Sequence, residues 1–174
     1  FETISLVHKM RETRAFVGFS RILPADGKLI EERIEALRLD RRINWLPAIT
    51  VRGEGVFLCL DKTRLTDWAD REDVRLRANR LGWVFNEAIL RRGGTPRPVS
   101  AKFVLLHTLA HLLINQLSFD CGYGSSSLRE RIYCDAEDVA QPMQGILIYT
   151  ASGDSEGTMG GLVRQGSPGR LENC

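Results

Sequence analysis

Apolar positions in the N-terminal part of the chain fall into short clusters that predict several small elements. Residues 1–13 mix apolar and charged side chains in a pattern that predicts a short helix. Residues 14–23 carry apolar side chains around a glycine, which is typical of a strand or a bulged strand. Residues 24–27, Pro-Ala-Asp-Gly, predict a turn. Residues 29–39 place apolar side chains at helical spacing among charges and predict a surface helix.

Two apolar runs, residues 45–52 and 56–60, flank the tripeptide Gly53-Glu54-Gly55. Runs of this kind bounded by glycine are typical of strands. A short glycine-containing connection is typical of a hairpin. The sequence therefore predicts two strands joined by a tight hairpin.

The clearest amphipathic helix is predicted over residues 67–92, where apolar side chains recur with a period near 3.6 and arginines lie between them. The glycines and prolines of residues 93–98 end it. Ser100 can then cap a second helix that runs to about Leu117. Because this second helix is apolar on nearly every side, we expect it to be a central, buried element.

The last third of the chain predicts further short elements. Residues 145–150 form a continuous apolar run that predicts an interior strand. A glycine-rich loop over residues 152–161 leads into a short helix through residues 162–163. Ser127 and Glu130 have the spacing of a capping box, which predicts another short helix. Together these elements predict a mixed α/β (α+β) fold, in which a central apolar helix packs on a small sheet.

The composition is that of a soluble globular chain, with 174 residues, 43% of them hydrophobic and 26% charged. These values exclude a disordered polar tail, a collagen-like rod and a disulfide-dense miniprotein. The longest apolar stretch, residues 103–117, contains several polar residues and is shorter than the roughly 20 residues that span a bilayer. The four cysteines lie far apart, which favours reduced thiols and a cytoplasmic location. Because the chain begins at Phe1 and ends at Cys174 in no recognisable terminal pattern, we expect a segment of a longer polypeptide.

His107 and His111 lie four residues apart, so both imidazoles face one side of the predicted central helix. That spacing suits a metal ion. The zinc-protease motif, however, has a glutamate directly after the first histidine, where this chain has Thr108. The alternative is a pair of histidines that are hydrogen-bonded inside the core, and we favour this structural role.

Cys121 and Cys134 are separated by twelve residues, without a Cys-x-x-Cys pair. Tetrahedral zinc sites usually draw their ligands from two close pairs, so zinc bound wholly within this segment is not favoured. A site completed by His107 or His111, or by cysteines beyond Cys174, stays open. We therefore expect no cofactor within this segment and place any zinc in the longer protein.

The glycine-rich loop over residues 152–161 joins a predicted strand to a helix N-terminus, an arrangement that can present backbone N–H groups to a phosphate. No Lys-Ser or Lys-Thr follows at P-loop spacing, and Asp154 and Glu156 would repel a phosphate. These carboxylates could instead hold a metal ion, cap the next helix or meet a basic partner. A tight structural turn is the favoured interpretation.

Arginine outnumbers lysine twenty to four, and between residues 64 and 98 eight arginines lie among five acids. An arginine-lined helix could follow a nucleic-acid backbone. The residues that would do so are Arg75, Arg77, Arg80, Arg91 and Arg92. Because the local excess is small and the whole chain carries a formal charge of +2, we favour a solvated helix face. The chain has no Walker A motif and no convincing pair of catalytic carboxylates.

Several segments occur in an order that is similar to that of a known family. They are residues 14–22 (RAFVGFSRI), 53–57 (GEGVF), 107–113 (HTLAHLL), 121–133 (CGYGSSSLRERIY), 145–150 (GILIYT) and 154–162 (DSEGTMGGL). With these segments the chain resembles the DrmB family, the B components of the DISARM antiphage defence system. The second half is also similar to the zinc-binding domain, formerly a domain of unknown function, of MrfA-type DNA-repair helicases.

The resemblance implies a bacterial, non-catalytic component that scaffolds a partner helicase, the DISARM A component, and assists its engagement of DNA. It divides the chain into a mixed strand and helix part, residues 1–98, and an MrfA-like zinc-binding-domain core, residues 99–174, truncated at its C-terminus. We expect the two parts to form one compact unit, without enzyme activity and without membrane contact. The family's metal role is carried by a cysteine cluster near the C-terminal end, of which Cys174 would be the first member.

The resemblance also covers polar and glycine positions whose role the sequence does not indicate. They are His107, His111, Cys121, Gly122, Ser127, Arg129, Glu130, Arg131, Asp154, Glu156, Gly157, Gly160 and Gly161. One alternative function is a metal-dependent nucleic-acid-processing enzyme that joins His107 and His111 to the loop of Asp154 and Glu156. Another is a structural zinc module of a DNA-repair helicase.

Overall fold

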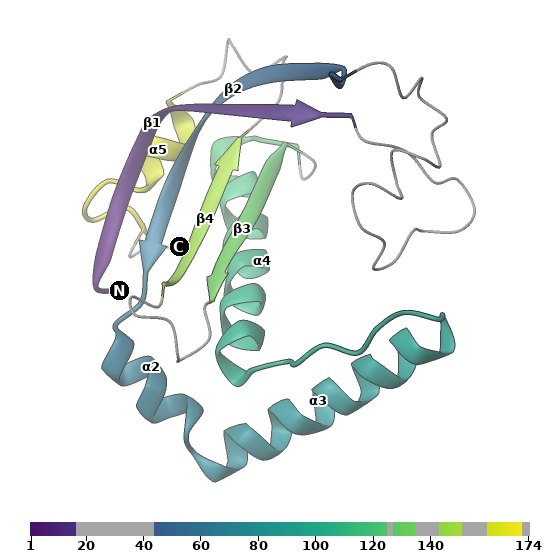
Figure 1. The fold of residues 1–174 in the computed structure, drawn as a ribbon. Coiled ribbons are helices and arrows are strands. Elements are labelled where there is room, and N and C mark those ends of the chain that lie inside the picture. The colour runs from purple at the N-terminus through teal and green to yellow at the C-terminus, as the bar shows by residue number, and fades with distance from the viewer. Residues whose placement is uncertain (17–43, 125–126, 135–142, 151–159, 172–174) are drawn as a thin grey trace.

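A four-stranded antiparallel sheet with helices around it forms the fold, so the predicted mixed α/β class is confirmed (Figure 1). The structure, a computed structural model, describes residues 1–16, 44–124, 127–134, 143–150 and 160–171. The strands, in the spatial order β1-β2-β4-β3, are β1 (Thr3–Ala15), β2 (Ala48–Cys59), β4 (Gln144–Thr150) and β3 (Leu128–Cys134). The helices are α2 (Lys62–Ala69), α3 (Glu72–Arg91), α4 (Ala101–Cys121) and α5 (Gly161–Gln165).

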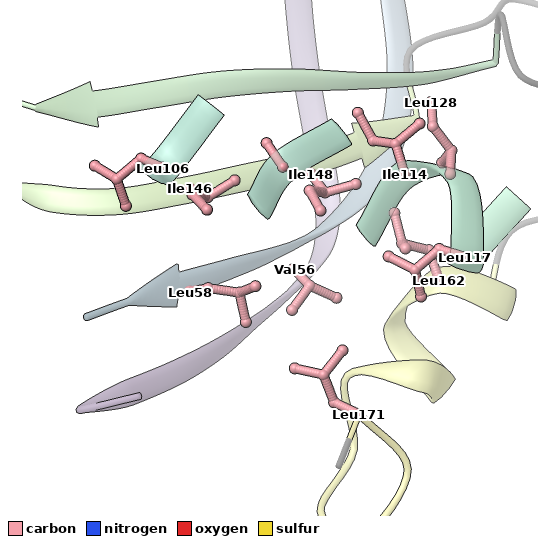
Figure 2. Close-up of a cluster of buried hydrophobic side chains, with 11 residues drawn as sticks. Val56, Leu58, Leu106, Ile114, Leu117, Leu128, Ile146, Ile148, Leu162 and Leu171 are labelled. Atoms are coloured by element: carbon pink, nitrogen blue, oxygen red, sulfur yellow. The ribbon is translucent and has the colours of Figure 1, made fainter. Parts of the chain in front are cut away.

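The core lies between α4 and one face of the sheet (Figures 1 and 2). The buried residues of α4 recur every three or four positions, so they form one stripe along the helix. They are Lys102, Leu106, Ala110, Ile114 and Leu117. This stripe meets a cluster that includes Val56, Leu58, Leu128, Ile146, Ile148, Leu162 and Leu171, as Figure 2 shows. Strands from both halves of the sequence therefore share one core.

α4 confirms the predicted helix and its N-cap but continues four residues beyond the predicted end near Leu117. It begins at Ser100, whose Oγ accepts a hydrogen bond from the backbone N–H of Phe103 at 3.1 Å. It ends at Gly122, which has a φ of 71° and so a left-handed conformation that suits glycine. The expectation that α4 is a buried element holds for one side only, since Leu112 is 62% exposed and Phe119 85% exposed. The helix covers one face of the sheet and keeps an apolar outer side.

The helix predicted over residues 1–13 is wrong, because this segment is the edge strand β1. Leu6 and Met10 are four residues apart, a spacing that suggests a helix. In the structure, β1 pairs Val7 with Gly55 and then Met10 with Gly53, so β1 has one extra residue at this point. The bulge shifts the alternation by one position and hides the period of two that identifies a strand.

The hairpin predicted between residues 45–52 and 56–60 is also wrong, because β2 runs through Gly53-Glu54-Gly55 as one strand. The two glycines permit close approach of β4. A Cβ at Gly53 would collide with the carbonyl oxygen of Thr150, and one at Gly55 would lie 2.9 Å from that of Ile148. These glycines are therefore explained by strand packing and not by a turn.

The short helix predicted from the capping-box letters of Ser127 and Glu130 is wrong as well, since β3 begins at Leu128. β3 pairs along its whole length with β4, with Leu128 opposite Thr150 and Glu130 opposite Ile148. Burial alternates from Leu128 to Ile132, as expected for a half-buried strand. The pairing with β4 comes from a distant segment and outweighs the local helix signal.

The single helix predicted over residues 67–92 is two helices, α2 and α3, with Asp70 and Arg71 between them. Asp61 caps α2 through a hydrogen bond from the backbone N–H of Arg64 at 2.8 Å. Gly93, with a φ of 75°, lies just after the end of α3, as the glycines and prolines of residues 93–98 predict. The chain after α3 returns along it, because Asn86 exchanges two hydrogen bonds of 3.0 Å with the backbone of Arg97.

Of the other predicted elements, the interior strand and the short C-terminal helix are confirmed, and the rest lie wholly or mostly outside the described residues. β4 is an interior strand, placed between β2 and β3, and the short helix α5 follows the glycine-rich loop. The predicted turn at residues 24–27 and the surface helix over 29–39 lie outside the described residues, as do residues 17–23 of the second predicted strand. None of the described helices is long and apolar enough to cross a membrane.

Candidate metal centre

Three side chains from two elements meet where α4 packs on β3, at a place that solvent reaches. They are His107 and His111 of α4 and Glu130 of β3. The two imidazole Nε2 atoms lie 3.1 Å apart. Glu130 Oε1 lies 3.1 Å from Nε2 of His107 and 3.5 Å from Nε2 of His111. All three atoms are thus in mutual contact.

Helical spacing and strand register bring these three residues together. His107 and His111 are one turn apart, so their side chains lie on the same side of α4. Glu130 is directly opposite Ile148, a core residue, so its side chain projects from the sheet face that α4 covers. The carboxylate therefore meets the imidazoles where α4 crosses β3.

The site is partly open to solvent, and its members are held by neighbouring side chains. The ring of His107 stacks on Phe103 with centroids 5.6 Å apart, and it meets the ring of His111 edge-on at 4.6 Å. The side chain of Glu130 is 21% exposed, while those of His107 and His111 are 45% and 60% exposed. Within the described residues, Glu130 Oε2 is buried and has no hydrogen-bond partner.

Chemically, this is a set that could hold a divalent transition metal. Two imidazole nitrogens and a carboxylate oxygen are ligands that zinc accepts. Four ligand atoms at about 2.0–2.1 Å from a tetrahedral ion lie about 3.3 Å from one another. The three separations of 3.1, 3.1 and 3.5 Å bracket that value, so the cluster has the size of a metal site.

The expectation that the two histidines are hydrogen-bonded inside the core is wrong in its location, because the side chains of His107 and His111 are 45% and 60% exposed. The i, i+4 spacing did place them on one face. Glu130 lies in the segment 121–133 that resembles the DrmB family, but the sequence did not predict its contact with the two histidines. Leu128 and Ile132 alternate with Arg129 and Arg131 as in a strand, but only the pairing of β3 with β4 brings Glu130 to the helix-facing side.

The cysteines do not gather within the described residues. Cys121 ends α4, whereas Cys134 ends β3 and lies 3.9 Å, Sγ to Oγ, from Ser100 at the beginning of α4. A helix of this length spans about 30 Å, so one ion cannot bind both thiolates. Cys174 lies outside the described residues, as do Asp154, Glu156 and Gly157, and any part these residues take in a metal site stays a prediction.

A second polar cluster explains one of the motif glycines, Gly160. Glu54, which is 2% exposed, accepts hydrogen bonds from the backbone N–H groups of Gly160 at 2.7 Å and Leu162 at 2.8 Å. It also accepts one from Tyr123 Oη at 3.1 Å. Burial of the phenol and, next, the Glu54 carboxylate raise the pKa of Tyr123 to about 12. Gly160 has a φ of 111°, which favours glycine, so this cluster ties β2, the end of α4 and the start of α5 together.

The remaining predicted residues lie on the surface. Arg75, Arg77, Arg80 and Arg91 are exposed on α3, and Arg92 is its exposed C-cap. The side chains of Arg77, Arg80 and Arg91 share one face of the helix, since they are spaced by three and eleven residues. Arg75 projects to another side. On β3, Arg129 and Arg131 are exposed, and Ser127 precedes the strand.

Comparisons with known proteins agree with the sequence resemblance. Residues 109–174 match the family model of the MrfA Zn-binding domain. Over 98% of its length, the chain is 37% identical to the DISARM protein DrmB of Bacillus paralicheniformis (strain ATCC 9945a / NCIMB 11709 / CD-2). The chain spans about 30% of the length of that relative. The similarity expected from the motifs is therefore confirmed, for a segment that matches part of a longer protein.

Proposed function

We propose that this chain is a segment of a non-catalytic component of a DISARM-type antiphage defence system, which scaffolds a partner helicase and assists its engagement of DNA. The observation that carries the proposal is the 37% identity to DISARM protein DrmB along 98% of the chain. The match of residues 109–174 to a zinc-binding domain named after MrfA supports a zinc-holding structural part. A bacterial cytoplasm is the compartment in which such a system would meet invading DNA.

The face of α3 that carries Arg77, Arg80 and Arg91 is the surface that we assign to nucleic acid. The exposed side chain of Trp83 lies on the same side of the helix, since it is three residues after Arg80. Guanidinium groups can neutralise phosphates, and an aromatic ring offers a base a stacking surface. Together these features support contact with DNA, although the chain as a whole is nearly neutral.

A salt titration of DNA binding tests this assignment. Charge reversal by Arg77→Glu, Arg80→Glu and Arg91→Glu in the full-length protein is expected to weaken binding. It should also flatten the plot of log K against log salt by about one unit of slope for each lost phosphate contact. The matched control reverses Arg11, Arg52 and Arg164, which are also exposed but lie on β1, β2 and α5. Equal weakening by both triple variants would show that α3 has no specific part in DNA contact.

The helicase partnership is tested separately. The full-length protein is expected to capture the helicase of its own defence system in a pull-down and to strengthen the binding of that helicase to DNA. If the helicase is neither captured nor affected, the scaffold proposal is wrong. A change in DNA binding with no helicase capture would leave a DNA-binding component without the proposed partner.

A metal-dependent nucleic-acid-processing enzyme is the second candidate, and the observation that favours it is the cluster of His107, His111 and Glu130. In this function, the cluster would hold the ion that polarises a phosphate or activates a water molecule. A cleavage assay with the full-length protein, DNA and RNA substrates and added Zn²⁺, Mn²⁺ or Mg²⁺ distinguishes the two. Cleavage that His111→Ala abolishes would establish the enzyme and contradict the non-catalytic proposal.

A further inference from the structure

We propose that His107, His111 and Glu130 together bind one zinc ion, and that the described part of the chain therefore has a zinc site made of imidazole and carboxylate rather than thiolate. The ligand atoms would be Nε2 of each histidine and Oε1 of the glutamate. This site is separate from the C-terminal cysteine cluster to which the family resemblance assigns its metal, so it goes beyond the structural zinc part of the proposed function. It does not depend on the helicase or on DNA.

Hydrogen bonding alone does not satisfy the three contacts. If both Nε2 atoms carry a proton, each can donate to Glu130 Oε1, but two N–H groups then face each other at 3.1 Å. If only one Nε2 carries a proton, the other presents its lone pair to a carboxylate oxygen. Either arrangement leaves one repulsive contact. A cation at the centre of the three atoms attracts the lone pairs of both Nε2 atoms and the charge of Oε1, so no contact is repulsive.

The carboxylate supplies a second, independent observation. Glu130 Oε2 is buried without a hydrogen-bond partner among the described residues, although an unpaired buried carboxylate oxygen is costly. A divalent ion beside Oε1 compensates the charge of the whole carboxylate. A bound ion therefore explains why the Glu130 carboxylate is buried, although no described protein group bonds to its Oε2 atom.

An ion at this place would be within reach of solvent. His111 and Glu130 line a shallow pocket of about 430 Å³, together with Asn115, Arg129 and Tyr149 among others. Three protein ligands leave one position of a tetrahedral ion free, and water can complete the set from this pocket. The cluster differs in this respect from a closed four-cysteine site.

Zinc is the metal we assign, because two histidines and one carboxylate around an open coordination position are a ligand set that zinc sites use. A set of two histidines and one carboxylate also suits ferrous iron. The experiment therefore measures both elements. The cysteines provide the competing ligand set, since Cys121 and Cys134 lie within the region that matches the zinc-binding family.

The test is the metal content of the full-length protein, measured by inductively coupled plasma mass spectrometry for the native chain and for single variants. His111→Ala and Glu130→Gln are each expected to contain one zinc equivalent per chain fewer than the native protein. His8→Ala is the matched control, because His8 is an exposed histidine on β1, the edge strand farthest from β3. It is expected to keep the full zinc content, as are Cys121→Ser and Cys134→Ser.

A thermal measurement separates metal loss from misfolding. EDTA is expected to lower the melting temperature of the native protein and of His8→Ala by more than that of His111→Ala. His111 is 60% exposed, so its replacement removes little packing and should preserve the circular dichroism spectrum. The proposal is overturned if His111→Ala and Glu130→Gln retain the full zinc content. It is also overturned if the lost equivalent is iron, or if a cysteine variant alone loses the zinc.

Discussion

Two consecutive helices of nearly equal length, α3 with 20 residues and α4 with 21, are used by this fold in opposite ways. α4 packs four buried apolar residues into the core on the sheet and carries two of the three members of the candidate metal centre. α3 lies beyond the N-terminal end of α4, off the sheet, and its buried residues are only Ala78 and Gly82 (Figure 1). Its outer face instead exposes large apolar side chains, among them Leu76, Trp83 and Leu90.

The difference teaches that an amphipathic pattern does not by itself identify the helix that builds the core. α3 has the more regular pattern, but the apolar residues Leu76, Trp83 and Leu90, spaced seven apart, form a stripe that faces away from its buried side. α4 has apolar residues all around, and the sheet selects one side of it. We therefore expect stability to depend on α4 and its sheet, and surface interactions to depend on α3. The following predictions test that division.

The largest loss of stability is expected from Leu106→Ala on α4. Leu106 is fully buried in the core cluster, so its truncation removes apolar contacts and leaves a cavity that costs about 2–5 kcal/mol. Urea unfolding followed by circular dichroism measures the change. The matched control, Leu112→Ala, lies on the exposed side of the same helix and should change the free energy of unfolding little. Similar losses for both variants would show that α4 is covered on both sides.

The second largest loss of stability is expected from Glu54→Ala, which tests how Glu54 on β2 holds α5 in place. The change leaves the backbone N–H groups of Gly160 and Leu162 and the hydroxyl of Tyr123 without their acceptor. An unsatisfied buried donor costs about 1–3 kcal/mol. Hydrogen exchange should show faster exchange in α5, while Glu72→Ala in the exposed first turn of α3 should show neither effect. Unchanged exchange in α5 would mean that Glu54 does not anchor it.

Much of α4, β4 and α5 was predictable because their signals are local. Ser100 at the start of α4 and Gly122 at its end are capping residues, and the continuous apolar run of β4 is typical of an interior strand. β1, β2 and β3 were misassigned because their identity depends on partners that are distant in sequence. The bulge of β1, the glycines of β2 and the capping-box letters of β3 each suggest another structure until the sheet is assembled.

The candidate metal centre divides in the same way. The spacing of His107 and His111 placed both imidazoles on one helix face, which needs only helical geometry. Glu130 could not be added from the sequence, because its contact with the histidines requires β3 to pair with β4 under α4. The cluster around Glu54 was hidden for the same reason, since it joins residues that are about a hundred positions apart.

Helix capping provides a third comparison of the two helices. Ser100→Ala removes the hydrogen bond from the backbone N–H of Phe103 and is expected to destabilise the protein by about 0.5–2 kcal/mol. Arg71, the N-cap of α3, makes no side-chain capping hydrogen bond within the described residues, so Arg71→Ala is the control and should cost less. Thermal unfolding of both variants measures the difference. A larger loss for Arg71→Ala would contradict the view that α4 determines stability.

Tyr123 makes the free energy of unfolding of the protein depend on pH. Its pKa is about 12 in the folded chain, and an unfolded tyrosine has a pKa of about 10. Between these values the folded state keeps a proton that the unfolded state has released, so stability falls as the pH rises through this range. Tyr123→Phe should lose about 0.5–1.5 kcal/mol near neutral pH through its missing hydrogen bond, and it should weaken this alkaline dependence. Unfolding measured from pH 8 to about 12 checks this, with Tyr133→Phe as the control.

The smallest effect on stability is expected on the outer face of α3, where Trp83 is 67% exposed and Leu76 63% exposed. Surface substitutions without a buried partner usually change the free energy of unfolding by less than about 0.5 kcal/mol, so Leu76→Ala and Trp83→Ala should unfold like the native chain. The same variants should change the binding of the full-length protein to its partners, because large exposed apolar patches are typical of interaction surfaces. If Trp83→Ala instead cost more than 1 kcal/mol with unchanged binding, α3 would belong to the packed core and the division between the two helices would fail.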